Sequence, residues 1–126
     1  MKNHSSRFLQ LVTDSKPQIK ETNPDQIQQK LLQKQPFFLI DVREESEWAE
    51  GHLPNAIHLS KGIIERDIEK VIPDSNAAIV LYCGGGYRSL LAASNIQKMG
   101  YTNVESMAGG YRGWLSAGYS ISSEKE

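Results

Sequence analysis

The residue best suited to covalent chemistry is Cys83, the only cysteine of the chain. It opens the loop Cys83-Gly84-Gly85-Gly86-Tyr87-Arg88, which follows an apolar segment and precedes Ser89 and a helical pattern. Three successive glycines favour positive φ values and a tight curl, so that backbone N–H groups can converge on one point. We expect that point to be the sulfur of Cys83.

The surroundings of this thiol predict a thiolate at neutral pH. The first amides of a helix beginning at Ser89 and the positive end of its dipole face the loop, and Arg88 adds a cation. In such settings a cysteine pKa commonly falls from about 8.5 to between ~3.5 and ~7.5. The alternative is an inert buried cysteine beside a flexible glycine turn, but the combination with Arg88 and a helix start favours an anion-handling thiol.

The elements that must hold this loop alternate between helix and strand. Continuous apolar runs at 37–40 and 77–82 are typical of strands covered on both faces. We also expect strands at 56–59 and 103–107, and helices at 8–14, 23–35, 44–50, 62–71, 89–99 and 111–116. This alternation predicts an α/β fold with a mostly parallel sheet, in which sites form beyond the carboxyl ends of strands. Cys83 lies at such an end.

Length and composition predict one domain and exclude some partners. The 126 residues fit a single domain over 1–126, with a core from about 19 to 121 and polar tails at 1–6 and 122–126. Fourteen basic and fifteen acidic residues give a formal charge of -1, which favours neither nucleic acid nor an anionic membrane as a partner. The apolar run from Phe8 to Val12 is too short for a signal sequence or a membrane span. With its lone cysteine, the chain is predicted to be cytoplasmic.

Asp41, Arg43 and His52 are titratable residues that could be combined with Cys83 into a Cys-His-Asp triad. We do not predict a triad, because the amides already stabilise a thiolate and ionisable groups at strand ends are more often ion-paired structural residues. Asp41 and Arg43 are therefore expected to support the site without reacting. His52 and His58 have no partners at metal-ligand spacing, so we predict no metal site.

Four stretches resemble the rhodanese family, and together they extend from about residue 19 to 121. Residues 38–44 resemble its first core strand with an Asp-Val-Arg ending, and residues 51–59 resemble its Gly-His-Ile-Pro-Gly-Ala motif. Residues 83–89 resemble its six-residue active-site loop, and residues 109–119 its closing Gly-Gly, Trp and Ala-Gly signature. Within this last stretch we expect Trp114 in the core. Arg112 follows the Gly109-Gly110 turn and could reach the mouth of the site, but we expect it in solvent.

The resemblance implies a rhodanese-like α/β domain of about five mostly parallel strands with helices on both faces, acting as a sulfurtransferase. Cys83 would take the outer sulfur of a donor such as thiosulfate as a persulfide and pass it to a thiol, to cyanide or to a thioredoxin-like protein. No metal or organic cofactor is implied, and the oligomeric state stays open. The anion-binding loop would consist of Gly84, Gly85, Gly86, Tyr87 and Arg88, supported by Ser89.

Two positions of the loop depart from family members that favour thiosulfate. Those members often carry a basic residue directly after the cysteine or before the last arginine, where this chain has Gly84 and Tyr87. A larger organic donor or a protein that contacts Tyr87 is therefore an alternative to thiosulfate.

Two other functions compete with sulfur transfer. Phosphatases and arsenate reductases of related shape resemble Cys-x5-Arg, whereas four residues separate Cys83 from Arg88 and no carboxylate in or beside the loop offers a general acid. A catalytically silent rhodanese-like module for binding or regulation is the second alternative. Such modules usually lack the cysteine that this chain retains.

Overall fold

A computed structural model describes residues 4–123, in which five strands form one sheet. The strands are Lys20–Thr22 (β1), Phe38–Asp41 (β2), Ile57–His58 (β3), Ile79–Tyr82 (β4) and Val104–Met107 (β5). Their order is β1-β5-β4-β2-β3, and every neighbouring pair within the described residues is parallel. The predicted α/β fold is confirmed, and the sheet is parallel throughout.

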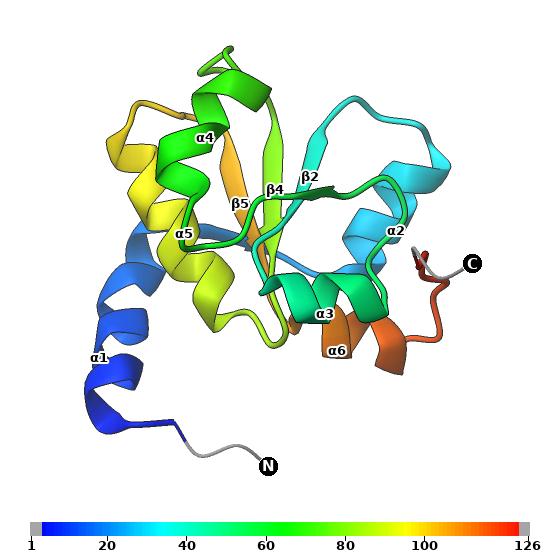
Figure 1. Ribbon diagram of the computed structural model, residues 1–126, viewed down its shortest axis with the longest axis horizontal. Coiled ribbons are helices and arrows are strands. Elements are labelled where there is room, and N and C mark those ends of the chain that lie inside the picture. The colour runs from blue at the N-terminus through cyan, green and yellow to red at the C-terminus, as the bar shows by residue number, and fades with distance from the viewer. Residues whose placement is uncertain (1–3, 124–126) are drawn as a thin grey trace.

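Helices cover both faces of this sheet. They are Ser6–Ser15 (α1), Pro24–Leu32 (α2), Glu45–Glu50 (α3), Ile64–Val71 (α4), Tyr87–Lys98 (α5) and Gly110–Ser116 (α6), and Lys16–Gln18 (η1) is a turn of 3-10 helix. Figure 1 shows α1, α4 and α5 on one side of the sheet and α2 and α6 on the other. None of the helices among residues 4–123 combines the length and the hydropathy needed to cross a bilayer.

The central strand β4 is buried on both of its faces. Ile79 and Leu81 pack into the cluster formed with α1, α4 and α5, whereas Val80 and Tyr82 pack into the cluster formed with α2 and α6. A strand covered in this way has to be apolar at every position, which is why the run at 77–82 shows no alternation. Trp114 of α6 is fully buried in the second cluster, as predicted.

Several boundaries differ from the predicted ones. α1 begins at Ser6, inside the predicted polar tail, because Phe8 and Val12 give it an inward face. β1 was not predicted, since three residues of Lys-Glu-Thr form no apolar run. α2 ends at Leu32, before the Pro36 expected to stop it. Its termination comes earlier because Lys34 has a φ of 55°, outside the helical region.

The chain end also differs from the prediction. Ser122, predicted to lie in a frayed tail, forms an antiparallel bridge with His52, with both N–H···O distances at 2.8 Å. The remaining parts of the predicted tails, residues 1–3 and 124–126, lie outside the described residues.

Helix α6 is attached by its first turn to the loop that follows β4. The N–H of Tyr111 donates to the carbonyl oxygen of Cys83 at 2.7 Å, and the N–H of Arg112 donates to that of Gly84 at 3.1 Å. Gly110 permits this approach, because its φ is 56° and a methyl group there would overlap the Cys83 carbonyl oxygen and lie 2.8 Å from that of Gly84. The loop therefore requires glycine at position 110 of a neighbouring helix.

This docking predicts that Gly110→Ala destabilises the protein much more than Gly118→Ala. Both glycines have positive φ values, but a methyl group at Gly118 would have nothing within 4 Å. Gly118→Ala should therefore cost only the backbone strain of about 1–2 kcal/mol, while Gly110→Ala adds an overlap costing about 1–3 kcal/mol more. Urea denaturation of the two variants measures the difference, and equal losses would contradict the docking.

Candidate active site

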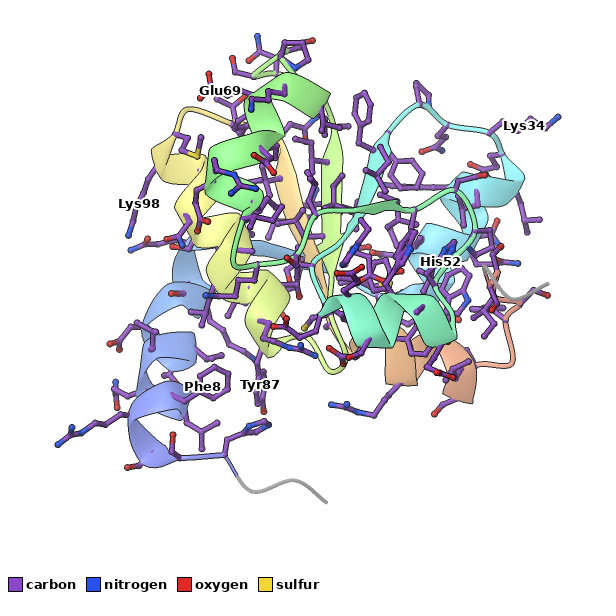
Figure 2. All side chains as sticks on the ribbon, viewed as in Figure 1. Phe8, Lys34, His52, Glu69, Tyr87 and Lys98 are labelled. Carbon is purple, nitrogen blue, oxygen red and sulfur yellow. The ribbon has the colours of Figure 1, made fainter. Side chains whose placement is uncertain are left out.

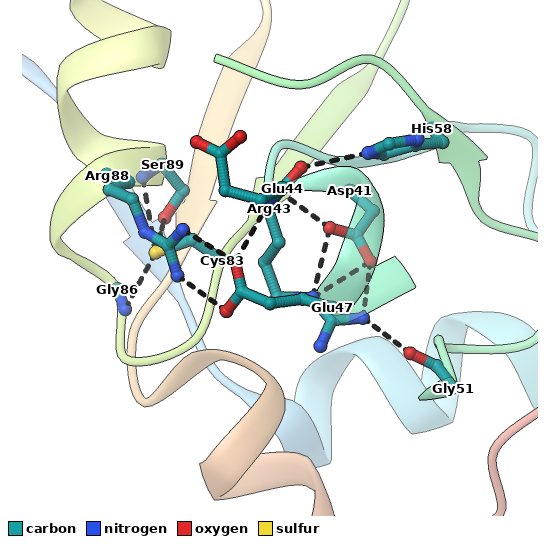
Figure 3. Close-up of polar contacts among 10 residues, drawn as sticks. All are labelled: Asp41, Arg43, Glu44, Glu47, Gly51, His58, Cys83, Gly86, Arg88 and Ser89. Carbon is teal, nitrogen blue, oxygen red and sulfur yellow. Dashed lines mark hydrogen bonds and ion pairs between the residues drawn. The ribbon is translucent and has the colours of Figure 1, made fainter. Parts of the chain in front are cut away.

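The sulfur of Cys83 accepts two hydrogen bonds from the backbone. The N–H of Gly86 lies 3.1 Å from Sγ and the N–H of Ser89 lies 3.3 Å from it, as Figure 3 shows. Cys83 comes directly after β4, and Gly86 and Ser89 lie at the start of α5, so the strand-to-helix turn brings donors and acceptor together. Amides aimed at one atom stabilise a negative charge there. The turn can therefore hold an anionic sulfur.

The three glycines of the loop have different roles. Of the three glycines, only Gly86 takes the positive φ that glycine permits, at 103°. Gly84 instead provides space, since a methyl group there would lie 3.0 Å from Arg112 Nη1 and 3.1 Å from Arg88 Nη2. Among the described residues, the amides of Gly86 and Ser89 are the ones that donate to Sγ, so fewer amides reach the sulfur than the loop sequence suggested.

A pair of buried hydroxyl groups lies behind the sulfur. Ser89 Oγ is 3.5 Å from Cys83 Sγ and 2.8 Å from Ser106 Oγ. Ser106 belongs to β5 and pairs in register with Leu81 of β4, which places it beside the strand that leads to Cys83. Because a hydroxyl can donate or accept, the Ser89 hydroxyl can accept a hydrogen bond from the Cys83 thiol and can donate one to the thiolate.

Cys83 itself is only 1% exposed and packs in the cluster that contains α5. Burial strengthens hydrogen bonds to the sulfur, because water does not compete with the two amides and the local dielectric constant is low. The sulfur therefore lies at the buried base of the loop formed by residues 83–88.

Arg88 of the loop is paired with a carboxylate that the sequence did not identify. Its Nη1 and Nη2 lie 2.9 and 3.1 Å from the two carboxylate oxygens of Glu47 on α3. Glu47 also accepts from the N–H of Glu44 in a capping box that starts α3. The hydrogen bond from Arg88 is the main reason that the pKa of Glu47 falls to about 2. The statement that no carboxylate lies beside the loop is therefore wrong.

Asp41 and Arg43 form a buried ion pair that supports the site from a distance. Arg43 Nη2 lies 2.8 Å from Asp41 Oδ2 and 2.5 Å from the carbonyl oxygen of Gly51, and the guanidinium lies 4.0 Å from the centre of the Tyr111 ring. Burial lowers the pKa of Arg43, but the hydrogen bond and the charge of Asp41 outweigh it and raise the pKa. The pair thereby connects β2 to Tyr111, whose N–H donates to the carbonyl oxygen of Cys83.

The ring of Tyr87, considered as a contact for a larger donor, is half-buried against the N-terminal part of the chain. Its ring meets His4 edge-on with ring centres 5.1 Å apart and lies 6.2 Å from the ring of Phe8 on α1. Figure 2 shows Phe8 and Tyr87 side by side. The first residue of α5 is thus used to hold α1 against the loop.

His52 and His58 both pack against Trp48 of α3. Trp48 stacks on His52 with ring centres 3.7 Å apart and on His58 with ring centres 4.9 Å apart. His58 Nε2 also lies 2.8 Å from the carbonyl oxygen of Arg43. Among residues 4–123, no group of three or more His, Cys, Asp or Glu side chains is placed to hold a metal ion.

Two residues beside the loop, Glu47 and Ser106, were not identified from the sequence. Glu47 carries no local signal, since any of several acidic residues in α3 could have faced the loop. Ser106 becomes visible only once the register of β5 against β4 is known. Arg112 is exposed, as expected, and its guanidinium also lies over the loop, as the alternative had it, since a methyl group at Gly85 would overlap its Nη2.

The Glu47–Arg88 pair predicts a pH-dependent contribution to stability. Because the folded protein lowers the pKa of Glu47 from 4.5 to about 2, the pair stabilises the protein above about pH 4.5 and loses this effect as the pH falls towards 2. Both side chains are about one third exposed, at 35% and 30%, so we expect Glu47→Gln to lose no more than about 1 kcal/mol at pH 7.

Urea denaturation at several pH values between 7 and 2.5 measures this contribution. The gap between wild type and Glu47→Gln should narrow over the acidic range, since protonated Glu47 and glutamine are both neutral. Glu45→Gln is the matched control, because Glu45 lies in the same first turn of α3 and is exposed. A gap that is independent of pH, or equal in both variants, would contradict the ion pair.

Comparisons with known proteins agree with this architecture. A family model for the Rhodanese-like domain matches residues 23–117. A sulfurtransferase of Allochromatium vinosum is 28% identical over 103 residues, which are 82% of this chain and 94% of that protein. The thiosulfate sulfurtransferase GlpE of Coxiella burnetii is 31% identical over 84 residues, which are 67% of this chain and 77% of GlpE.

One solved structure covers nearly the whole chain. A Rhodopseudomonas palustris protein, described as of unknown function and as a possible tyrosine phosphatase, has a TM-score of 0.84 at 25% identity. The likeness covers 97% of this chain and 99% of that one. Since the family model spans α2 to α6, with the sheet from β2 to β5 and the Cys83 loop, the chain belongs to the rhodanese-like domain family.

Proposed function

We propose that this protein is a sulfurtransferase that carries sulfane sulfur on Cys83 as a persulfide. The observation that supports it most is the convergence of the Gly86 and Ser89 amides on one sulfur atom, at 3.1 and 3.3 Å. Two amides at this distance suit Sγ as a thiolate, the form in which it attacks the donor and to which the acceptor returns it. Similarity to sulfurtransferases of other organisms supports the same class of reaction.

In the first step the Cys83 thiolate attacks the outer sulfur of a donor. With thiosulfate, a bond forms between Sγ and the outer sulfur, the bond between the two thiosulfate sulfurs breaks, and sulfite leaves with that electron pair. The charges balance, because the thiolate and the thiosulfate dianion together carry three negative charges, as do the persulfide anion and the sulfite dianion. This is covalent catalysis, in which one transfer is divided between two displacements.

In the second step an acceptor removes the outer sulfur from Cys83. A thiolate attacks it, becomes a persulfide and returns Cys83 to the thiolate, and cyanide would leave as thiocyanate by the same displacement. A cellular thiol or a thioredoxin-like protein in the cytoplasm would be the physiological acceptor. The thiol of Cys83 donates to Ser89 Oγ, and the Ser89 hydroxyl, which also bonds to Ser106 Oγ, can donate to Sγ once the sulfur is a thiolate.

Phosphate-ester hydrolysis is the competing function, because one similar structure is described as a possible tyrosine phosphatase. Two features of the site disfavour it. Glu47 is a carboxylate beside the loop, but with a pKa of about 2 it holds no proton to give to a leaving alkoxide near neutral pH. The amides of Gly86 and Ser89 are also occupied by Sγ itself, whereas a phosphatase needs amides for the phosphoryl oxygens.

The persulfide predicts a specific change of mass. After exposure to thiosulfate and removal of excess donor, intact-protein mass spectrometry should show the wild type gaining one sulfur atom, about +32 Da, and losing it on addition of cyanide. Cys83→Ser should gain none and keep most of its stability, because the serine hydroxyl oxygen can accept the hydrogen bonds from the Gly86 and Ser89 amides. Tyr101→Phe is the matched control, since it removes a buried hydroxyl from the cluster that contains Cys83 and leaves the nucleophile and its hydrogen-bond partners unchanged.

The two functions give different results with the same protein samples. Absence of the heavier species with thiosulfate and with an organic persulfide, combined with turnover of an aryl phosphate that depends on Cys83, would overturn the proposal in favour of a phosphatase. A persulfide that forms without aryl phosphate turnover supports it.

A further inference from the structure

Sulfur donors are commonly anionic, but the cation of the loop around Cys83 is already paired with a carboxylate. Arg88 is engaged by both carboxylate oxygens of Glu47, at 2.9 and 3.1 Å. The positions where a basic residue would be expected hold Gly84 and Tyr87, and Tyr87 packs against α1. A cation for the donor must therefore come from outside the loop.

Arg112 on α6 places its guanidinium over that loop. A methyl group at Gly85 would overlap Arg112 Nη2, and one at Gly84 would lie 3.0 Å from Arg112 Nη1. The same point at Gly84 is 3.1 Å from Arg88 Nη2, so the two guanidinium groups approach one spot beside the residue that follows Cys83. The backbone holds Arg112 in place, because its N–H donates to the carbonyl oxygen of Gly84 at 3.1 Å.

The charge of Arg112 is not neutralised within the described part of the chain. Three other arginines each pair with a carboxylate: Arg43 with Asp41, Arg66 with Asp67 and Arg88 with Glu47. Arg112 is exposed, and among residues 4–123 its guanidinium has neither a hydrogen bond nor an ion pair. An arginine keeps its charge at every physiological pH and offers donors in a planar fork that matches oxyanions.

We propose that Arg112 determines donor specificity by binding the anionic leaving group of the sulfur donor. The donors would be small molecules whose sulfane sulfur is attached to an oxyanion, with thiosulfate as the simplest. This inference rests on the proposed sulfur transfer for its biological meaning, although anion recognition beside Cys83 can be measured without it. It also explains why Gly84 and Gly85 lack side chains, since the guanidinium occupies that space.

Alkylation of Cys83 tests the anion preference without any sulfur donor. Iodoacetate and iodoacetamide form the same carbon–sulfur bond and release the same iodide, but only iodoacetate carries a negative charge. With one cysteine in the chain, mass spectrometry reports the rate at Cys83 alone. Arg112→Gln should slow iodoacetate about five-fold relative to iodoacetamide, as expected for one solvent-exposed charge contact, and Arg112→Lys should restore most of the ratio.

Lys98→Gln is the control for net charge. Lys98 ends α5, about 16 Å along the helix from the loop end, and its loss changes the total charge equally. The ratio of the two alkylation rates should be unchanged in this variant. In the wild type the ratio should also fall at high salt, because an exposed charge contact is screened.

Steady-state transfer from thiosulfate to cyanide provides the second readout. Arg112→Gln should raise the KM for thiosulfate about five-fold and change kcat less than two-fold, because the amides that hold the sulfur are intact. An unchanged alkylation ratio together with an unchanged KM would overturn the assignment of Arg112. A shifted alkylation ratio in a protein that transfers no sulfur would support Arg112 as the anion-binding residue and overturn the proposed function, so the two failures are distinguishable.

Discussion

The hydrogen bonds from the Gly86 and Ser89 amides to the Cys83 sulfur set the requirements for the surrounding structure. For both amides to reach one atom, β4 has to end at Tyr82 and α5 has to begin within a few residues of it. The residue that joins them, Gly86, lies in the left-handed region, which glycine enters at little cost. The central position of β4 in the sheet then keeps the sulfur out of water, where the two amides are most effective.

Three neighbouring elements hold the loop, and each of them contacts a different group of it. α6 binds two loop carbonyl oxygens through the N–H groups of Tyr111 and Arg112. α3 binds the Arg88 side chain through Glu47, and β5 binds the Ser89 hydroxyl through Ser106. The buried pair of Asp41 and Arg43 acts one step further away. It carries no bond to the sulfur, yet it stacks on the ring of Tyr111 and bonds to the Gly51 carbonyl, which fixes α6 relative to β2.

The fold was accessible from the sequence because its strongest signals are local. The apolar runs of β2 and β4 and the glycine loop each depend on a few consecutive residues, and each led to the right element. Contacts between elements were not accessible in this way. Nothing near Glu47 indicates that it, rather than Glu44 or Glu45, faces Arg88, because that choice depends on how α3 packs. The loop glycines were understood only in part for the same reason, since their need for space comes from Arg112, which is more than twenty residues away in the chain.

Charge around the loop is distributed so that the sulfur and the donor depend on different groups. The amides that hold Sγ carry no net charge, and the nearest loop cation is balanced by Glu47, so stabilisation of the anionic sulfur is local and little affected by salt. Selection of the donor instead falls to an exposed cation on another helix, whose interaction with an anion is weak, long in range and sensitive to salt. Such a division lets a substitution at the surface of α6 alter which donors are used while the hydrogen bonds at Cys83 stay the same. Under this arrangement the buried part of the site sets the chemistry, and the exposed residue at position 112 sets the substrate.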